Sequence, residues 1–116
     1  MKKFLAIYLG SAESLAAWRA VEEATRKERE KEGMAAWMAW GTNHGTSIVD
    51  MGSPLGKTKR IDPNGVSDTK NEIGAYTIVE AESHEEAAKM FEGHPHFTLF
   101  PGSAVELMEC LPMPKM

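Results

Sequence analysis

The pattern of apolar positions predicts a small sheet and two helical regions. Apolar side chains alternate or run together in short segments typical of strands, and recur every three to four residues in longer, helical ones. Strands are expected over residues 3–9, 46–51, 57–62, 73–81 and 103–111. Helices are expected over residues 14–40 and 83–91, the second opening at a capping box formed by Ser83 and Glu86.

The first helical region loses its apolar stripe midway. Residues 26–32 are all charged, and opposite charges three and four residues apart support a solvated helix with nothing to bury. An uninterrupted helix over residues 14–40 would be about 40 Å long, which exceeds the width of such a domain. We therefore expect a bend or a break at Gly33.

Residues 57–62 return as a hairpin strand after residues 46–51, so the order of these elements is strand, helix, strand or hairpin, strand, helix, strand. This order predicts an α+β, ferredoxin-like βαββαβ fold, an antiparallel sheet with two helices on one face. The chain has 116 residues and no internal repeat or linker, so residues 1–116 are expected to form a single domain.

The expected sheet is apolar on both faces. In the first strand Phe4, Ala6 and Tyr8 alternate with equally apolar neighbours on the other side. Two helices cover only one face, and the other would expose a larger apolar patch than a monomer usually tolerates. We therefore expect a homodimer whose sheets pack through a twofold axis. The alternative is a monomer in which residues 34–40 or the hairpin fold over the open face.

Composition and charge argue against several classes of partner. A net charge of −4 gives no general attraction to nucleic acid or to an anionic membrane surface. No apolar run approaches the roughly twenty residues of a membrane span. The start, Lys2 and Lys3 before a short apolar run, imitates a secretory signal, but the run is shorter than the roughly seven residues required. Cys110 is the only cysteine, which fits a cytoplasmic protein and suggests a buried thiol.

Several segments look familiar together. They are residues 2–9, 56–60, 65–68, 76–84, 91–96 and 105–109. In these segments the chain resembles the YCII-related proteins, a group that includes the DGPF-type members. The resemblance implies a dimeric α/β barrel, with a cleft between sheet, loops and partner. Related proteins often pair a histidine on the first helix with an aspartate on the following strand; here His44 follows that helix, and residues 50–56 replace the DGPF turn.

Three residues are candidates for acid–base catalysis: His44, Asp50 and His94. Asp50 could orient an imidazole or act as a base, or simply end a strand. His94 and His96 lie two residues apart, so in an extended backbone both rings could bind one metal ion. No third metal ligand is nearby in the sequence, so we expect no metal site. The alternative for His94 is a helix stop whose ring bonds to the backbone.

Further residues are candidates for ligand binding: His96, Trp37, Trp40, Glu80, Glu106 and Lys57. The tryptophans could line an aromatic pocket or serve in packing. Glu80 and Glu106 share a face with apolar neighbours, so they are either functional carboxylates or rim positions in salt bridges. Lys57 belongs to the one basic cluster, with Lys59 and Arg60, which could attract an anion or form a solvated edge.

Two functions fit these residues. One is a small-molecule enzyme that performs acid–base chemistry without a cofactor, in a cleft near the dimer interface. The other is a non-catalytic ligand-binding or regulatory module. Neither a Ser-His-Asp pattern nor a glycine-rich phosphate loop occurs in the sequence, which disfavours hydrolases and nucleotide-dependent enzymes.

Overall fold

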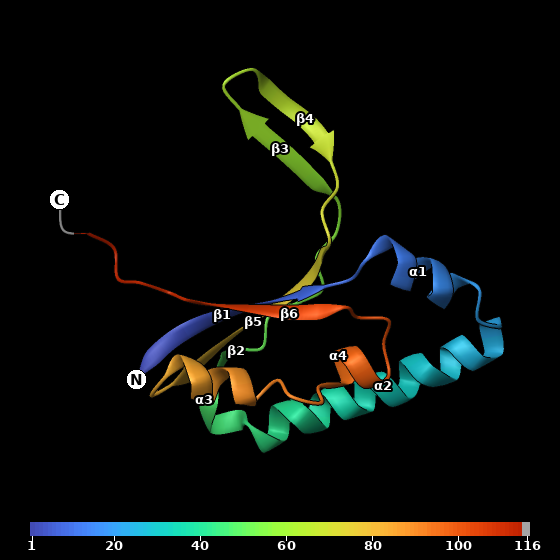
Figure 1. Cartoon of the computed structure of the whole chain (residues 1–116), viewed down its shortest axis with the longest axis horizontal. Coiled ribbons are helices and arrows are strands. Elements are labelled where there is room, and N and C mark those ends of the chain that lie inside the picture. The colour runs from blue at the N-terminus through green and yellow to red at the C-terminus, as the bar shows by residue number, and fades with distance from the viewer. Residues whose placement is uncertain (115–116) are drawn as a thin grey trace.

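Four antiparallel strands form the central sheet, in the order β2-β5-β1-β6 (Figure 1). The structure is a computed structural model that describes residues 1–114. The strands of this sheet are β1 (Lys2–Leu9), β2 (Ile48–Asp50), β5 (Ile73–Ala81) and β6 (Ala104–Glu109). The two central strands, β1 and β5, pair along their whole length. This strand order confirms the predicted ferredoxin-like α+β fold.

Three helices cover one face of this sheet, and a fourth lies beside one end of it (Figure 1). The covering helices are α2 (Glu23–Asn43), α3 (His84–Lys89) and α4 (Pro95–Thr98), and the outlying helix is α1 (Ala12–Arg19). A single 3-10 turn, Gly45–Ser47, joins α2 to β2. Ser83 caps α3 through its hydroxyl, which accepts the backbone N–H of Glu86, as the capping box predicts. No helix within residues 1–114 has the length and apolar character needed to cross a membrane.

The first helical region breaks earlier than the sequence predicts. Residues 20–22 separate α1 from α2, whereas α2 continues through Gly33, so the bend expected there was wrong. Gly33 is buried against the ring of Phe100, and a Cβ atom at this position would lie 2.5 Å from that ring. The glycine therefore permits a close approach between α2 and the segment that follows α4.

The strand register divides the sheet into two faces. Phe4, Ala6 and Tyr8 point toward the helices and are buried, together with Thr77 and Val79 of β5. The opposite side, which we call the open face, carries no helix. The residues that alternation places on the open face are Lys3, Leu5, Ile7, Leu9, Tyr76, Ile78, Glu80, Glu106 and Met108. Residues 34–40 belong to α2 on the helical side, so they do not cover the open face.

The segment between β2 and β5 contains a separate two-stranded hairpin. Its strands are β3 (Thr58–Asp62) and β4 (Gly65–Thr69). The sequence predicted a strand at β3 but none at β4, because β4 shows no apolar alternation; every one of its residues is exposed. At the turn, the Asp62 carboxylate accepts the backbone N–H of Asn64, and Gly65 has a φ of 119°. The hairpin projects away from the body on the side of the open face (Figure 1).

The last strand is shorter than predicted. β6 ends at Glu109, and Cys110 directly after it is exposed. Within one protomer the thiol is therefore not buried. The backbone N–H of Cys110 still donates to the carbonyl oxygen of Lys3 at 2.8 Å, but alternation with Glu106 and Met108 places its side chain on the open face.

Candidate functional site

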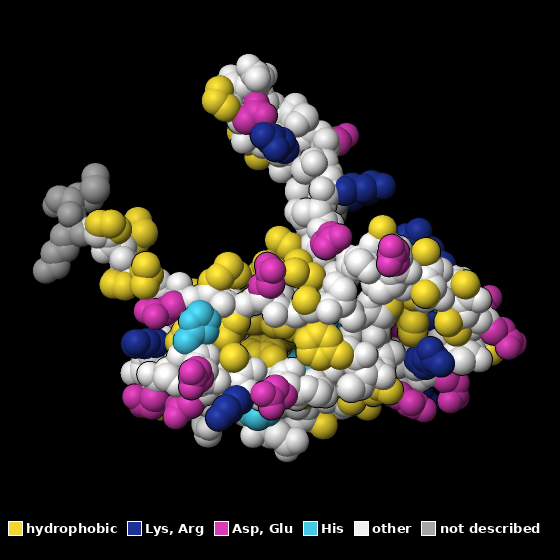
Figure 2. Space-filling view, viewed as in Figure 1, with side chains coloured by type: hydrophobic (Ala, Val, Ile, Leu, Met, Phe, Trp, Pro, Cys, Tyr) yellow, Lys and Arg dark blue, Asp and Glu magenta, His cyan; other side chains and the backbone are white. Residues whose placement is uncertain are grey.

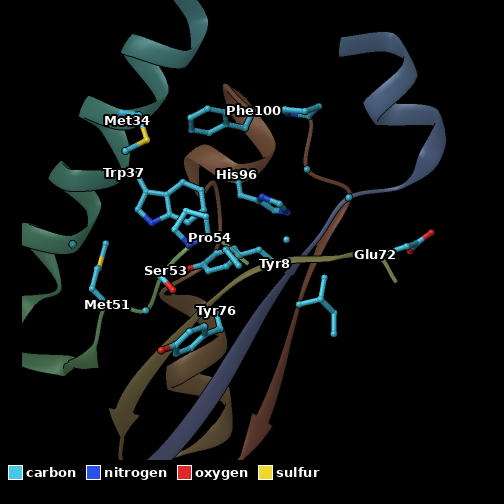
Figure 3. Close-up of a pocket in the computed structure, with 18 of the residues that line it drawn as sticks. Tyr8, Met34, Trp37, Met51, Ser53, Pro54, Glu72, Tyr76, His96 and Phe100 are labelled. Carbon is cyan, nitrogen blue, oxygen red and sulfur yellow. The ribbon is translucent and has the colours of Figure 1, made fainter. Parts of the chain in front are cut away.

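A cleft of about 770 Å³ opens between α2 and one end of the sheet (Figure 3). Six parts of the chain contribute to it. They are α1 with Leu15; α2 with Met34, Trp37 and Met38; the sheet with Tyr8 and Ala75; the segment after β2 with Met51, Ser53 and Pro54; the segment before β5 with Asn71 and Glu72; and the segment after α3 with His96 and Phe100. The cleft thus joins segments that are far apart in the sequence and lies within one protomer.

The walls of this cleft are mainly apolar. Aromatic rings and methionine side chains predominate, and methionine adapts readily to ligands of different shape. Within residues 1–114, no lysine or arginine lines the cleft, and Glu72 is its one carboxylate. An anionic ligand would find no countercharge here, whereas an uncharged planar ring could pack against the aromatic side chains.

His96 contributes the one imidazole of the described lining. Its Nε2 lies 2.8 Å from the carbonyl oxygen of Leu9 and 3.1 Å from that of Ala104. Because both partners are acceptors, Nε2 carries the proton and the neutral ring has a bare Nδ1. Burial lowers the pKa of His96, and the two backbone hydrogen bonds partly oppose this effect. His96 is therefore a neutral, oriented proton acceptor at pH 7.

The turn after α4 holds the His96 ring in this position. The backbone N–H of Gly102 donates to the carbonyl oxygen of His96, at 2.9 Å. A Cβ atom on Gly102 would lie 2.3 Å from the His96 ring, so only glycine lets the turn close over it. The Pro101-Gly102 pair is a recognisable turn signal in the sequence, and it could have indicated that this segment folds back onto the histidine.

His94 lies behind the cleft wall, inside the core. Its ring is fully buried, with centroids 4.5 Å from Trp37, 4.6 Å from Trp40 and 5.2 Å from Tyr8. Nδ1 accepts the backbone N–H of His96 at 2.9 Å, which caps α4 and leaves the proton on Nε2. Nε2 has no hydrogen-bond partner among the described residues. Burial lowers the pKa of His94 to about 4, with smaller contributions from His96 and His44.

The two candidate tryptophans occupy different places. Trp37 lines the cleft and packs edge-on against His94. Trp40 is buried in the core, where its indole Nε1 donates to the carbonyl oxygen of Met90 at 2.7 Å. Of the pair, only Trp37 is placed to contact a molecule in the cleft.

The other acid–base candidates lie outside the cleft. His44 ends α2, and its ring centroid is 5.2 Å from that of Trp40. Asp50 is exposed at the edge of the sheet, where its carboxylate accepts the backbone N–H of Gly52 at 2.9 Å and the hydroxyl of Tyr76 at 3.5 Å. The structure therefore does not gather these candidates in the cleft, although the rings of His44 and His94 both pack on Trp40.

The charged candidates for ligand binding also lie elsewhere. Glu80 and Glu106 are on the open face, and Lys57 is exposed at the base of the hairpin. None of the three lines the cleft. Within residues 1–114, no group of three His, Cys, Asp or Glu side chains is arranged to hold a metal ion.

Tyr8 is a cleft residue that sequence reasoning did not single out. Thr77 donates its hydroxyl hydrogen to the carbonyl oxygen of Met51 at 3.0 Å, so the Tyr8 hydroxyl must donate to Thr77 Oγ1 at 2.9 Å. Burial raises the pKa of Tyr8 to about 12, despite the bond to Thr77. Tyr8 therefore forms a neutral floor of the cleft, and in the sequence it looks like any other core position of β1.

The comparisons with known proteins identify a fold but not a family. No family model matches the chain, and no curated protein matches it. A solved structure similar to it is the 5-chloro-2-hydroxyhydroquinone dehydrochlorinase (TftG) from Burkholderia phenoliruptrix AC1100, in complex with 2,5-dihydroxybenzoquinone. It matches with a TM-score of 0.53 at 22% identity, over 90% of this chain and 89% of that chain. At this identity the likeness establishes the α+β fold.

Proposed function

We propose that this protein is a small-molecule enzyme that binds a planar, uncharged, oxygenated ring compound and removes a proton from it with His96. The observation that carries the proposal is the state of the His96 ring in the cleft wall, with Nε2–H held by two carbonyls and Nδ1 bare. A base that is neutral and oriented before the substrate arrives needs little rearrangement to accept a proton.

The chemistry of the cleft supports a hydroxylated aromatic substrate. Such a ring packs on Trp37 and Phe100, and its hydroxyl supplies the proton that His96 accepts. The fold neighbour is named for the loss of hydrogen chloride from a hydroxylated ring, a reaction that a base can assist. We take its substrate, 5-chloro-2-hydroxyhydroquinone, as the first compound to test, with acid–base chemistry performed by side chains alone.

A non-catalytic binding protein is the second candidate. It is favoured by the low polarity of the cleft, whose one imidazole is accompanied by few other polar side chains. In that case the cleft would hold the same class of ligand without changing it, and His96 would serve as a hydrogen-bond acceptor.

Replacing His96 by glutamine should separate these two candidates. The glutamine amide can still donate to the backbone carbonyls, but it cannot accept a proton, so ligand binding should persist while kcat falls by about 100-fold. Binding of 2-hydroxyhydroquinone would be followed anaerobically by tryptophan fluorescence, and turnover of the 5-chloro compound by chloride release.

The matched control is His44→Gln, which alters a histidine outside the cleft and should leave both measurements unchanged. Binding without chloride release in the wild type would favour the non-catalytic candidate. No binding of either compound by the wild type would contradict the proposed ligand class. Equal turnover by wild type and His96→Gln would exclude His96 as the base.

His94 has a separate place in this proposal, as the residue that positions His96. Its Nδ1 occupies the same place on the side chain as Oδ1 of asparagine, a good N-cap acceptor. His94→Asn should therefore keep the bond to His96 and most of the activity, although it leaves a cavity. His94→Phe fills the aromatic surroundings but removes the acceptor, and should lower kcat/KM by about tenfold.

A purely structural role for His94 predicts the reverse order, because phenylalanine packs better than asparagine in the same space. The measurements are kcat/KM, the thermal midpoint of unfolding and the ¹⁵N spectrum of the His96 ring, which reports its tautomer. A more active phenylalanine variant with an unchanged His96 spectrum would contradict the positioning role.

We also propose that the chain acts in the cytoplasm as a homodimer of one YCII-related domain, with two sheets packed to form a dimeric α/β barrel. The open face supports this proposal, because neither α2 nor the hairpin covers its apolar side chains within the protomer. Met108 on this face is 42% exposed. Burial of such a surface against a second copy would remove it from water.

A further inference from the structure

The hairpin formed by β3 and β4 has no evident support within one protomer. Ile61 and Val66 lie opposite each other in its register, and they are 73% and 68% exposed. An isolated two-stranded hairpin is at best marginally stable in water. An exposed cross-strand pair of β-branched side chains on such an element indicates a surface that is buried in an assembly.

The direction of the hairpin indicates what could bury it. It rises from the body on the side of the sheet opposite α2, α3 and α4, which is the side of the open face (Figure 1). Any molecule that covers the open face therefore lies beside the hairpin. Figure 2 shows hydrophobic side chains both at the foot of the hairpin and near its tip, with basic and acidic side chains along it.

The hairpin is a basic element in an acidic chain. Residues 57–70 contain four cations and two carboxylates, a net charge of +2, whereas the whole chain has a net charge of −4. Lys59 pairs with Asp68, and Arg60 pairs with Asp62 at 3.1 Å. The remaining cations, Lys57 and Lys70, flank the base of the hairpin and form no ion pair within residues 1–114.

The open face has an excess of negative charge, opposite to that of the hairpin. Glu80 and Glu106 lie on it without an ion pair among the described residues, and Asp50 lies at its edge. Lys3 is opposite Glu80 in the register but forms no ion pair with it. Two open faces packed together would bring these carboxylates close to their copies, and like charges in an interface are costly. A dimer through this face therefore needs countercharge.

We propose that the hairpin of each copy is a basic arm that docks on the second copy, where Lys57 and Lys70 neutralise Glu80 and Glu106 and the Ile61–Val66 pair is buried. This inference rests on the proposed dimer and adds the surface that makes the dimer specific. A twofold axis repeats each contact, so both arms act in the same way. It also gives one explanation for the basic cluster and for the two carboxylates on an apolar face.

A charge-swap cycle tests the arm directly. The double variant Lys57→Glu, Lys70→Glu should raise the dissociation constant of the dimer by about tenfold. Each exposed ion pair is weak, but the twofold axis repeats every pair, so each substitution removes two of them. Glu80→Lys with Glu106→Lys should weaken the dimer similarly. The fourfold variant that combines both pairs should restore wild-type affinity. Sedimentation velocity at low and high salt gives the constants, and Lys31→Glu with Lys89→Glu is the control.

Additive weakening of the dimer in the fourfold variant would contradict the proposed docking of the arm, since it would mean that the lysines do not contact the glutamates. Hydrogen exchange of residues 58–69 supplies an independent measurement. Protection should rise with protein concentration as the dimer forms. A wild type that dimerises with an equally unprotected hairpin would contradict the arm and leave the proposed dimer intact, whereas a monomeric wild type would contradict both.

Discussion

Replacing Ile7 by glutamate should convert the proposed dimer into a monomer. Ile7 lies on the central strand of the open face, where its register partners are Tyr76 on β5 and Glu106 on β6. In a twofold interface each copy would bury a new carboxylate beside an existing one. Desolvating a charge costs several kcal/mol when no partner compensates, so the dissociation constant should rise by about 1000-fold or more. Sedimentation equilibrium measures this change.

The matched control is Ala24→Glu, which adds the same charge to an exposed position of α2 on the other side of the molecule. It should leave the dimer unchanged. Circular dichroism should show a folded monomer for Ile7→Glu, because this side chain points away from the core formed with the helices. If Ile7→Glu remained dimeric with wild-type affinity, the subunits would have to associate through another surface.

The fold could be predicted from the sequence where burial imposes a pattern. β1 and β5 alternate between two apolar faces, and the register confirms both sets. β4 could not be predicted, because an exposed hairpin strand has no core to impose alternation. Gly33 shows the limit of a local interpretation: it suggests a bend, yet its role is a long-range approach to Phe100. Tertiary contact overrides local propensity at such a position.

The candidate site was less predictable than the fold, because contacts between segments remote in sequence decide where each side chain lies. The sequence separates His94 and His96 by a single proline, and nothing local distinguishes a core histidine from a cleft histidine. The difference comes from residues that are remote in sequence: Leu9 and Ala104 bind one ring, while Trp37 and Trp40 enclose the other. The spacing of the two histidines indicated that they were candidate functional residues. Only the fold shows that one ring lies in the cleft wall and the other in the core.

The free energy of unfolding should fall by about 3 kcal/mol, from the His94 contribution alone, as the pH falls from 6.5 to 4. Burial lowers the pKa of His94 from 6.5 to about 4 in the folded protein. Between these values the unfolded chain binds a proton that the folded chain does not, so stability decreases with acid. The contribution is fully present above pH 6.5. Protonation of the folded state would also break the bond from Nδ1 to the backbone N–H of His96.

The variant His94→Asn isolates this effect, because it keeps the hydrogen-bond acceptor and does not titrate. Urea unfolding of both proteins between pH 4.5 and 7.5 gives the free energy of unfolding of each as a function of pH. The carboxylates and the lowered pKa of His96 contribute equally to the two curves. Near pH 5 the wild-type slope should exceed that of the variant by about 1 kcal/mol per pH unit. The absolute stabilities will differ because asparagine leaves a cavity, so the slopes are the quantity to compare. Equal slopes of the two curves would contradict this prediction, because they would mean that His94 takes up a proton as easily in the folded protein as in the unfolded chain. The enclosure of its ring by Tyr8, Trp37 and Trp40 disfavours a charged imidazole in the folded protein.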